Sequence, residues 1–79
     1  MNNQYEKNMG QNIRALRESK NMTQEQLSAK LQLRNCTITR SALAKIEVGQ
    51  RHLYPDEIFH IKEILNVSYE DIFPVMPHL

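Results

Sequence analysis

The sequence has few cysteines, glycines and aromatic residues, and these scarcities exclude several classes of protein. Cys36 is the only cysteine, so an intramolecular disulfide is impossible and a reducing compartment is favoured. Gly10 and Gly49 are the only glycines, which leaves no glycine-rich phosphate loop. No apolar run is long enough to span a membrane, and the first ten residues lack the apolar region of a signal peptide. The sequence therefore predicts a cytoplasmic protein that does not enter membranes.

The sequence also lacks a set of residues that could form a catalytic or metal centre. His52, His60 and His78 do not have metal-ligand spacing with one another or with Cys36. Cys36 has no obvious paired base, and we interpret it as a bystander thiol in a polar loop. We therefore expect a protein that is not an enzyme, with no catalytic residue, no metal and no cofactor.

Positive charge is concentrated locally, although the net charge is only +1. Residues 34–51 carry four basic and one acidic side chain, a net of +3, whereas the rest of the chain has a net of −2. This asymmetry can produce a positive face on a nearly neutral molecule. At 79 residues, the chain is expected to form one domain, with its core at about residues 5–73 and a C-terminal tail over 74–79.

Apolar residues recur at helical spacing through most of the chain, which predicts an all-α fold of five short helices. The first helix is expected over residues 5–20. Thr23 begins the second helix and forms a capping box with Gln26. Residues 32–38 are interpreted as a connection. No segment shows convincing period-two alternation, so no strand is expected.

The third helix is expected over about residues 39–48. Thr39 or Ser41 can serve as its N-cap, and Gly49 follows its last residue. A fourth helix starts at a proline and a fifth at a serine cap. The predicted core side chains of the third and fourth helices are Leu43, Ile46, Ile58, Ile61 and Leu65.

The second and third helices, with the turn between them, have the pattern of a helix-turn-helix unit. In such a unit, the second of the two helices packs one face on the core and presents the other to the DNA major groove. Hydrogen-bond donors on that exposed face can contact base edges, and the third helix offers three: Arg40, Ser41 and Lys45. The pattern predicts double-stranded DNA as a partner, although a solvated basic helix face is the simpler alternative.

Hydroxyl and amide donors near the helix N-termini are candidate phosphate contacts. Gln24 stands at the start of the second helix, and Thr37 and Thr39 precede the third. The unpaired N–H groups of a helix N-terminus also attract anions. For Gln24, the alternative is a polar residue that merely suits a helix start.

Three stretches of the sequence resemble the Cro/cI-type (XRE family) helix-turn-helix proteins of bacteria and their phages: IRALRESKNMTQEQLSAKL, RSALAKIEVGQR and NVSYEDIF. The resemblance spans about residues 8–73 and implies a lambda-repressor-like DNA-binding domain. It further implies a sequence-specific transcriptional regulator, of the repressor type found in phages and mobile elements. Such a protein acts without a cofactor and as a homodimer, at least on DNA.

The resemblance also implies roles for individual residues. The base-reading positions of the family fall on Arg40, Ser41 and Lys45, as the helical pattern predicts. Gln24 matches a glutamine that contacts a phosphate and braces the third helix, and Thr39 lies next to the DNA backbone. Gly49 and Arg51 match the loop that meets the phosphodiester after the third helix.

One implied pair is structural. Arg17 and Glu47 match an internal ion pair that ties the first helix to the end of the third. Removing one partner of such a pair leaves an uncompensated charge.

The connection between the second and third helices is longer than is typical of the family. It extends over residues 32–39, and Gln32 stands where the family usually has a glycine. Two arrangements are open: Arg34 and Asn35 reach the phosphates, or Ile38 enters the core while the rest of the loop projects.

A function in another class is also open, because fold does not determine function. The chain could be a protein-interaction module that keeps the helix-turn-helix fold and holds a partner protein with its third helix or long loop. The C-terminal tail is expected to be a disordered end. Alternatively, apolar residues near it form part of a dimer contact: Tyr69, Phe73, Val75, Met76 and Leu79.

Overall fold

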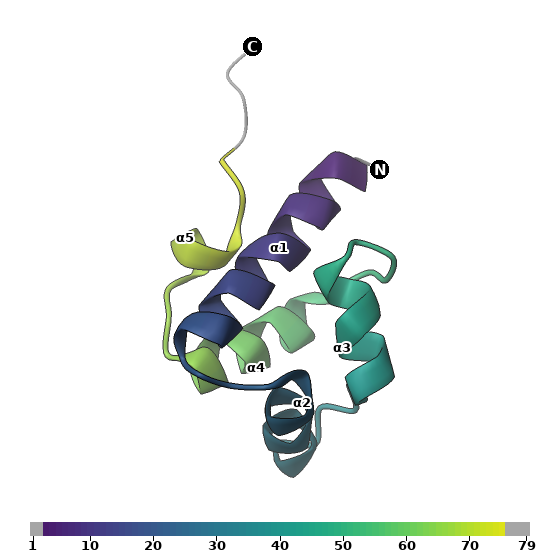
Figure 1. Ribbon diagram of the computed structural model, residues 1–79, viewed down its shortest axis with the longest axis vertical. Coiled ribbons are helices and arrows are strands. Elements are labelled where there is room, and N and C mark those ends of the chain that lie inside the picture. The colour runs from purple at the N-terminus through teal and green to yellow at the C-terminus, as the bar shows by residue number, and fades with distance from the viewer. Residues whose placement is uncertain (1–2, 76–79) are drawn as a thin grey trace.

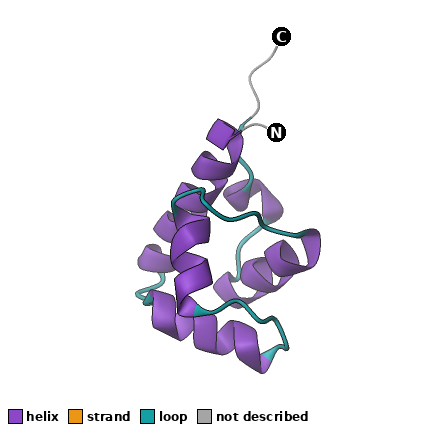
Figure 2. Cartoon of the chain, turned by 90° about the vertical axis from the view of Figure 1, so that its right-hand side faces the viewer, coloured by secondary structure: helices purple, strands orange, loops and turns teal. Residues whose placement is uncertain are grey.

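The computed structural model describes residues 3–75, and within that range it contains helices and loops but no strand (Figures 1 and 2). The helices are α1 (Asn3–Ser19), α2 (Gln24–Leu33), α3 (Arg40–Glu47), α4 (Pro55–Leu65) and α5 (Tyr69–Ile72). The predicted all-α fold of five short helices is confirmed. Within the same residues, no helix has both the length and the apolar character needed to cross a membrane.

The first helix packs mainly on two of the other helices. α1 contacts α3 and α5, which flank it on opposite sides in Figure 1, while α2 packs on α3 and α4. Gly10 permits the close approach of α1 and α3, because a Cβ atom at this position would lie 2.1 Å from the carbonyl oxygen of Ile46. The absence of one side chain therefore sets how near the third helix can come.

The helix starts follow the predicted side-chain caps. Thr23 Oγ1 accepts a hydrogen bond from the Gln26 N–H at 3.0 Å, and Gln26 Oε1 accepts one from the Thr23 N–H at 2.8 Å. Thr39 Oγ1 accepts a bond from the Ala42 N–H at 3.1 Å, so Thr39 is the N-cap of α3 and Ser41 is not. The predicted starts of α4 and α5 are also confirmed.

The first four helices end in the same left-handed turn, although the chain has little glycine. The residues with positive φ are Asn21, Asn35, Gly49 and Asn66. Each donates its N–H to the carbonyl three residues earlier, and the next residue donates to the carbonyl five residues earlier. This is the Schellman pattern, and asparagine tolerates the left-handed region better than other residues with a side chain. Three asparagines thus occupy the left-handed position that glycine usually takes.

The hydrophobic core includes every core residue that the pattern predicts. Cys36 belongs to it as well, with only 6% of its surface exposed. The interpretation of Cys36 as a thiol in a polar loop is therefore wrong. Cys36 follows the left-handed Asn35 and donates its N–H to the Leu31 carbonyl, which turns its side chain inward. Burial, together with the nearby carboxylates of Glu57 and Asp56, raises the pKa of this thiol.

Of the second expected arrangement, the entry of Ile38 into the core is confirmed, because Ile38 is completely buried. The rest of the loop does not simply project, since Cys36 is buried as well. Ser28 Oγ donates a hydrogen bond to the Ile38 carbonyl oxygen at 2.8 Å. The predicted start of the connection at residue 32 is wrong, since α2 continues through Leu33 before the left-handed turn. The Arg34 guanidinium carbon lies 5.8 Å from the ring centroid of Phe59, on α4.

The apolar residues near the C-terminus are placed only in part. Tyr69 and Phe73 are partly exposed, and Val75 is 93% exposed. The other two residues of the predicted contact, Met76 and Leu79, lie outside the described residues, as do His78 and most of the predicted tail.

Candidate nucleic-acid interface

The outer face of α3 carries the three side chains predicted to read bases. Leu43, Ile46 and Glu47 are buried, and they fix which side of α3 meets the rest of the protein. Arg40, Ser41 and Lys45 are exposed, and none of them forms a hydrogen bond or ion pair with another described side chain. Ser41 and Lys45 are four residues apart and therefore share one face, while Arg40 is the first residue of the helix.

The same face extends to an apolar residue. Val48, at the C-terminal cap of α3, is 48% exposed. It lies on the same side as Ser41 and Lys45, because it is seven and three residues away from them. Its spacing from the buried Leu43 and Ile46 leaves Val48 away from the core, but an apolar side chain alone is no sequence signal for a DNA contact. A methyl-bearing side chain on such a face is suited to contact the methyl group of thymine.

A hollow lined by four polar residues lies at the N-terminal end of α3. It has a volume of about 410 Å³ and is lined by Gln32, Asn35, Thr37 and Thr39. The two predicted phosphate-contacting threonines are therefore together. Gln32 and Asn35 join them only because α2 is extended to Leu33 and the chain then reverses at Asn35.

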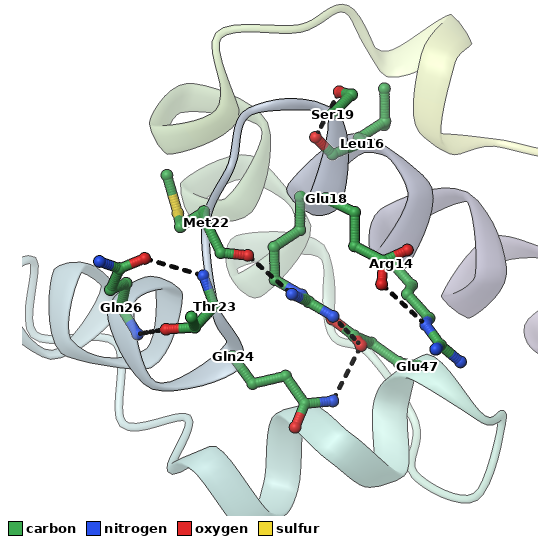
Figure 3. A network of polar contacts seen from close by, with 10 residues as sticks. Arg14, Leu16, Glu18, Ser19, Met22, Thr23, Gln24, Gln26 and Glu47 are labelled. Carbon is green, nitrogen blue, oxygen red and sulfur yellow. Dashed lines mark hydrogen bonds and ion pairs between the residues drawn. The ribbon is translucent and has the colours of Figure 1, made fainter.

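A buried network connects the start of α2 to the end of α3 (Figure 3). Arg17 Nε and Nη2 donate to the two carboxylate oxygens of Glu47 at 2.7 and 3.0 Å, and Arg17 Nη1 donates to the Met22 carbonyl oxygen at 2.7 Å. Gln24 Nε2 donates to Glu47 Oε1 at 2.9 Å. The hydrogen bonds with Glu47 raise the pKa of Arg17. Three segments thus converge on one carboxylate, which fixes α2 relative to α3.

In the loop after α3, the groups predicted to donate to phosphates form hydrogen bonds within the chain. The Gly49 N–H donates to the Ile46 carbonyl oxygen at 3.1 Å. Arg51 forms two hydrogen bonds of 3.0 Å to the carboxylate of Glu57, and it also donates to the carbonyl oxygen of His52 at 2.8 Å. The charge of Arg51 is therefore largely compensated. His52 in turn contacts Glu6 through its Nδ1 atom.

A lysine from α1 lies beside this loop. Gly49 is so close to α1 that a Cβ atom on it would lie 2.8 Å from the Lys7 Cα atom. Lys7 is exposed and has no ion pair with another described residue. Sequence reasoning missed Lys7, because a contact across 42 positions leaves no local pattern. Its juxtaposition with the end of α3 adds a cation to this side of the molecule.

The described residues do not bring metal-binding side chains together. In residues 3–75, no group of three or more His, Cys, Asp and Glu side chains is arranged to hold a metal ion. Cys36, His52 and His60, which lack metal-ligand spacing in the sequence, also have separate environments in the structure.

The fold and the free outer face of α3 define a helix-turn-helix protein. A helix-turn-helix family model (HTH_3) matches residues 13–72, and the chain belongs to this family of Cro/C1-type (XRE) helix-turn-helix proteins. Among curated proteins, no sequence matches significantly. Membership in the family supports a DNA-binding transcription regulator rather than an enzyme.

A solved structure shares the whole architecture. The crystal structure of the DNA-binding domain of BldD superimposes with a TM-score of 0.80 over 94% of this chain and 100% of that chain. The two sequences are 19% identical. The likeness therefore establishes a common fold, which includes the arrangement of α2 and α3.

Proposed function

We propose that this protein is a sequence-specific regulator that reads the DNA major groove with α3 and represses transcription by occupying an operator. The observation that carries the proposal is the division of α3 into two faces. One face is held by the core and the Arg17–Glu47 pair, and the other presents a guanidinium, a hydroxyl and an ammonium group that have no hydrogen-bond or ion-pair partner among the side chains of residues 3–75. Arg40 is suited to a bidentate contact with guanine O6 and N7, and Ser41 and Lys45 can donate to other base edges.

Contacts to the DNA backbone are proposed on both sides of that face. Thr37 and Thr39 offer hydroxyl groups at the front of α3, and Gln24 keeps one amide N–H and its carbonyl oxygen after bonding Glu47. Lys7 offers an ammonium group near the rear. Phosphate contacts, which carry most of the non-specific affinity, then frame the base-reading residues.

Gly49 and Arg51 are expected to contribute less to phosphate binding than the family pattern implies. A phosphate would have to compete with the Ile46 carbonyl oxygen for the Gly49 N–H. It would also have to compete with the carboxylate of Glu57 for Arg51. We therefore assign the main electrostatic contact at this end of α3 to Lys7.

Two copies are expected to bind one operator. A single recognition helix reads only a few base pairs, so useful specificity requires a near-palindrome with half-sites about 34 Å apart.

The alternative of a module that holds a partner protein through α3 or the long loop has less support. The long loop does not project, because Cys36 and Ile38 lie in the core. Retention on non-specific DNA at low salt distinguishes the two functions, since even a weak DNA-binding protein is held there. Complete flow-through would favour the protein-binding module.

The decisive experiment selects an operator from a random DNA pool and then measures the affinity of variants at several salt concentrations. Arg40→Ala is expected to cost about 1–3 kcal/mol and to relax base preference at one position. Lys7→Ala is expected to weaken binding to all sequences and to lower the salt slope by about 1.

Lys62→Ala is the matched control for Lys7→Ala, because Lys62 lies on α4 and contacts Tyr69 of α5. It removes the same charge away from the proposed interface, so the salt slope should not change. Equal effects of the two lysine substitutions would contradict the proposed orientation of the protein on DNA.

A further inference from the structure

The charges of the chain are separated along the fold. Residues 3–53, with α1 to α3, carry nine basic and four acidic side chains, a net of +5. Residues 54–75, with α4 and α5, carry five acidic side chains and one lysine, a net of −4. The near-neutral total therefore conceals a strongly acidic C-terminal part, which DNA would repel.

An apolar groove lies on this acidic part. It is lined by Pro55, Ile58, Tyr69 and Phe73 and has a volume of about 530 Å³. The rings of Tyr69 and Phe73 stack with centroids 6.0 Å apart and an interplanar angle of 25°. Both rings are about 40% exposed, whereas Ile58 is buried. Exposed aromatic side chains beside an apolar hollow are a common mark of an interaction surface.

Two exposed carboxylates stand next in the sequence to residues that line the groove. Asp56 follows Pro55 at the start of α4, and Glu70 follows Tyr69 at the start of α5. Both are exposed, and neither forms an ion pair within the described residues. The neighbouring cation, Lys62, lies over the Tyr69 ring at 5.2 Å, but its ammonium group also pairs with Glu63.

We propose that this groove binds a segment of a partner protein in which an apolar side chain is flanked by Lys or Arg. The apolar side chain enters between Ile58 and the two stacked rings, and the basic residues meet Asp56 and Glu70. The charge complementarity selects this occupant, because oppositely charged surfaces favour association and like charges oppose it.

A second copy of the chain is a poorer occupant for the same reason. A symmetric contact through this groove would bring together the 54–75 segments of two copies, each with a net charge of −4. The size of the groove also favours a peptide segment over a second copy. Its four lining residues can accommodate one anchoring side chain, whereas a standard protein–protein interface uses about 20–30 residues on each partner.

The proposed partner site is independent of the DNA interface. α5 and α3 lie on opposite sides of α1 in Figure 1, so a segment bound at α5 leaves the outer face of α3 free. A regulator with this arrangement can hold DNA and a basic partner at the same time.

The test titrates the isotope-labelled full chain with the peptide Lys-Arg-Leu-Leu-Lys-Arg and follows backbone amide chemical shifts. We expect shifts confined to α4 and α5, and weaker binding at high salt because exposed charges are screened. Two comparison peptides separate the contributions: one replaces both leucines with serine, and the other replaces all basic residues with acidic ones. Neither should shift the groove residues.

Matched charge reversals give the decisive comparison. Glu70 and Glu25 each occupy the second position of a helix, on α5 and α2. Glu70→Lys is expected to weaken peptide binding about fivefold, and Glu25→Lys should leave it unchanged. Asp56→Asn provides a gentler second variant, with an expected loss of about twofold. The spectra of each variant also report whether it folds.

The proposal fails if the basic peptide produces no shifts at millimolar concentration or shifts residues outside α4 and α5. Equal effects of Glu70→Lys and Glu25→Lys would likewise overturn it. Concentration-dependent shifts of the groove residues without peptide would assign the groove to a second copy instead. None of these results depends on whether the protein binds DNA.

Discussion

The loop before α3 (34–39) and the loop after it (48–54) hold the two ends of one helix by different interactions. The first is anchored by apolar burial, with Ile38 completely enclosed in the core. The second is anchored by charge, with Arg51 paired to Glu57 in a partly buried position. The helix that is proposed to face DNA is thus secured in two physically distinct ways.

The difference determines how each end should respond to solution conditions. Burial of an aliphatic side chain contributes about 1.5–3 kcal/mol and does not depend on pH. Ion pairs near the surface usually contribute about 0–1 kcal/mol and weaken with salt. We therefore expect the front loop to supply most of the stability and the rear loop to supply the part that varies with pH and salt.

Truncation of the front anchor should have the largest effect. Ile38→Ala removes a fully buried side chain and is expected to destabilise the protein by about 3 kcal/mol, as a cavity forms in the core. Urea unfolding measures the loss, which should be similar at low and high salt. Leu33→Ala is the control, because Leu33 is 86% exposed, and it should change stability by less than about 0.5 kcal/mol. A small effect of Ile38→Ala would mean that the loop is not anchored by burial.

Substitutions in the left-handed turns on either side of α3 should cause an intermediate loss of stability. Gly49→Ala is expected to cost about 2 kcal/mol, because φ is +79° and the new Cβ atom would meet the backbone of Lys7. Asn35→Ala meets only the backbone penalty, since Asn35 is exposed, and should cost about 1 kcal/mol. Thermal unfolding of both variants tests the order, and a larger loss for Asn35→Ala would refute the close packing of the rear loop on α1.

The rear ion pair should give the smallest effect and the only marked pH dependence. Partial burial alone would raise the pKa of Glu57, but hydrogen bonds from Arg51 and the Tyr54 N–H outweigh it and leave the pKa below its ordinary value. A lowered folded-state pKa adds stability above the unfolded value of about 4.3, and the stability disappears as pH falls through the folded value.

Glu57→Gln tests this dependence by comparison with the wild type. The wild type should exceed the variant in stability by about 0.5–1 kcal/mol at neutral pH and low salt. The advantage should shrink as pH falls below the ordinary pKa of glutamate and vanish once pH has passed below the lowered folded-state pKa of Glu57. Urea unfolding from pH 7 to pH 3 measures it. A constant difference across that range would show that the pair does not contribute through charge.

Local patterns in the sequence predict much of the fold. The caps at Thr23 and Thr39 and the left-handed Gly49 depend on residues within a few positions of one another, so composition and spacing are sufficient. Asn35 shows where such reasoning falls short. An asparagine before Cys36 can place a left-handed turn and send the cysteine inward, but the same dipeptide also suits an exposed loop.

The candidate site likewise contains residues that local patterns predict and residues whose partners these patterns cannot predict. The exposed side chains Arg40, Ser41 and Lys45 follow from the periodicity of one helix. The partners of Gln24 and Arg51 do not, because they depend on which carboxylate the folded chain brings near each residue. Their roles on DNA stay predictions, since a free structure records only the partners within the chain.

The outer face of α3 has a consequence for how such a protein can change over time. Because Arg40, Ser41 and Lys45 are exposed and form no hydrogen bond or ion pair with another described side chain, substitutions there should alter stability by less than about 0.5 kcal/mol each. New operator preferences are therefore accessible without loss of a foldable protein. Natural variants, or a library randomised at these three codons, can therefore acquire preferences for many different operator sequences on the same fold.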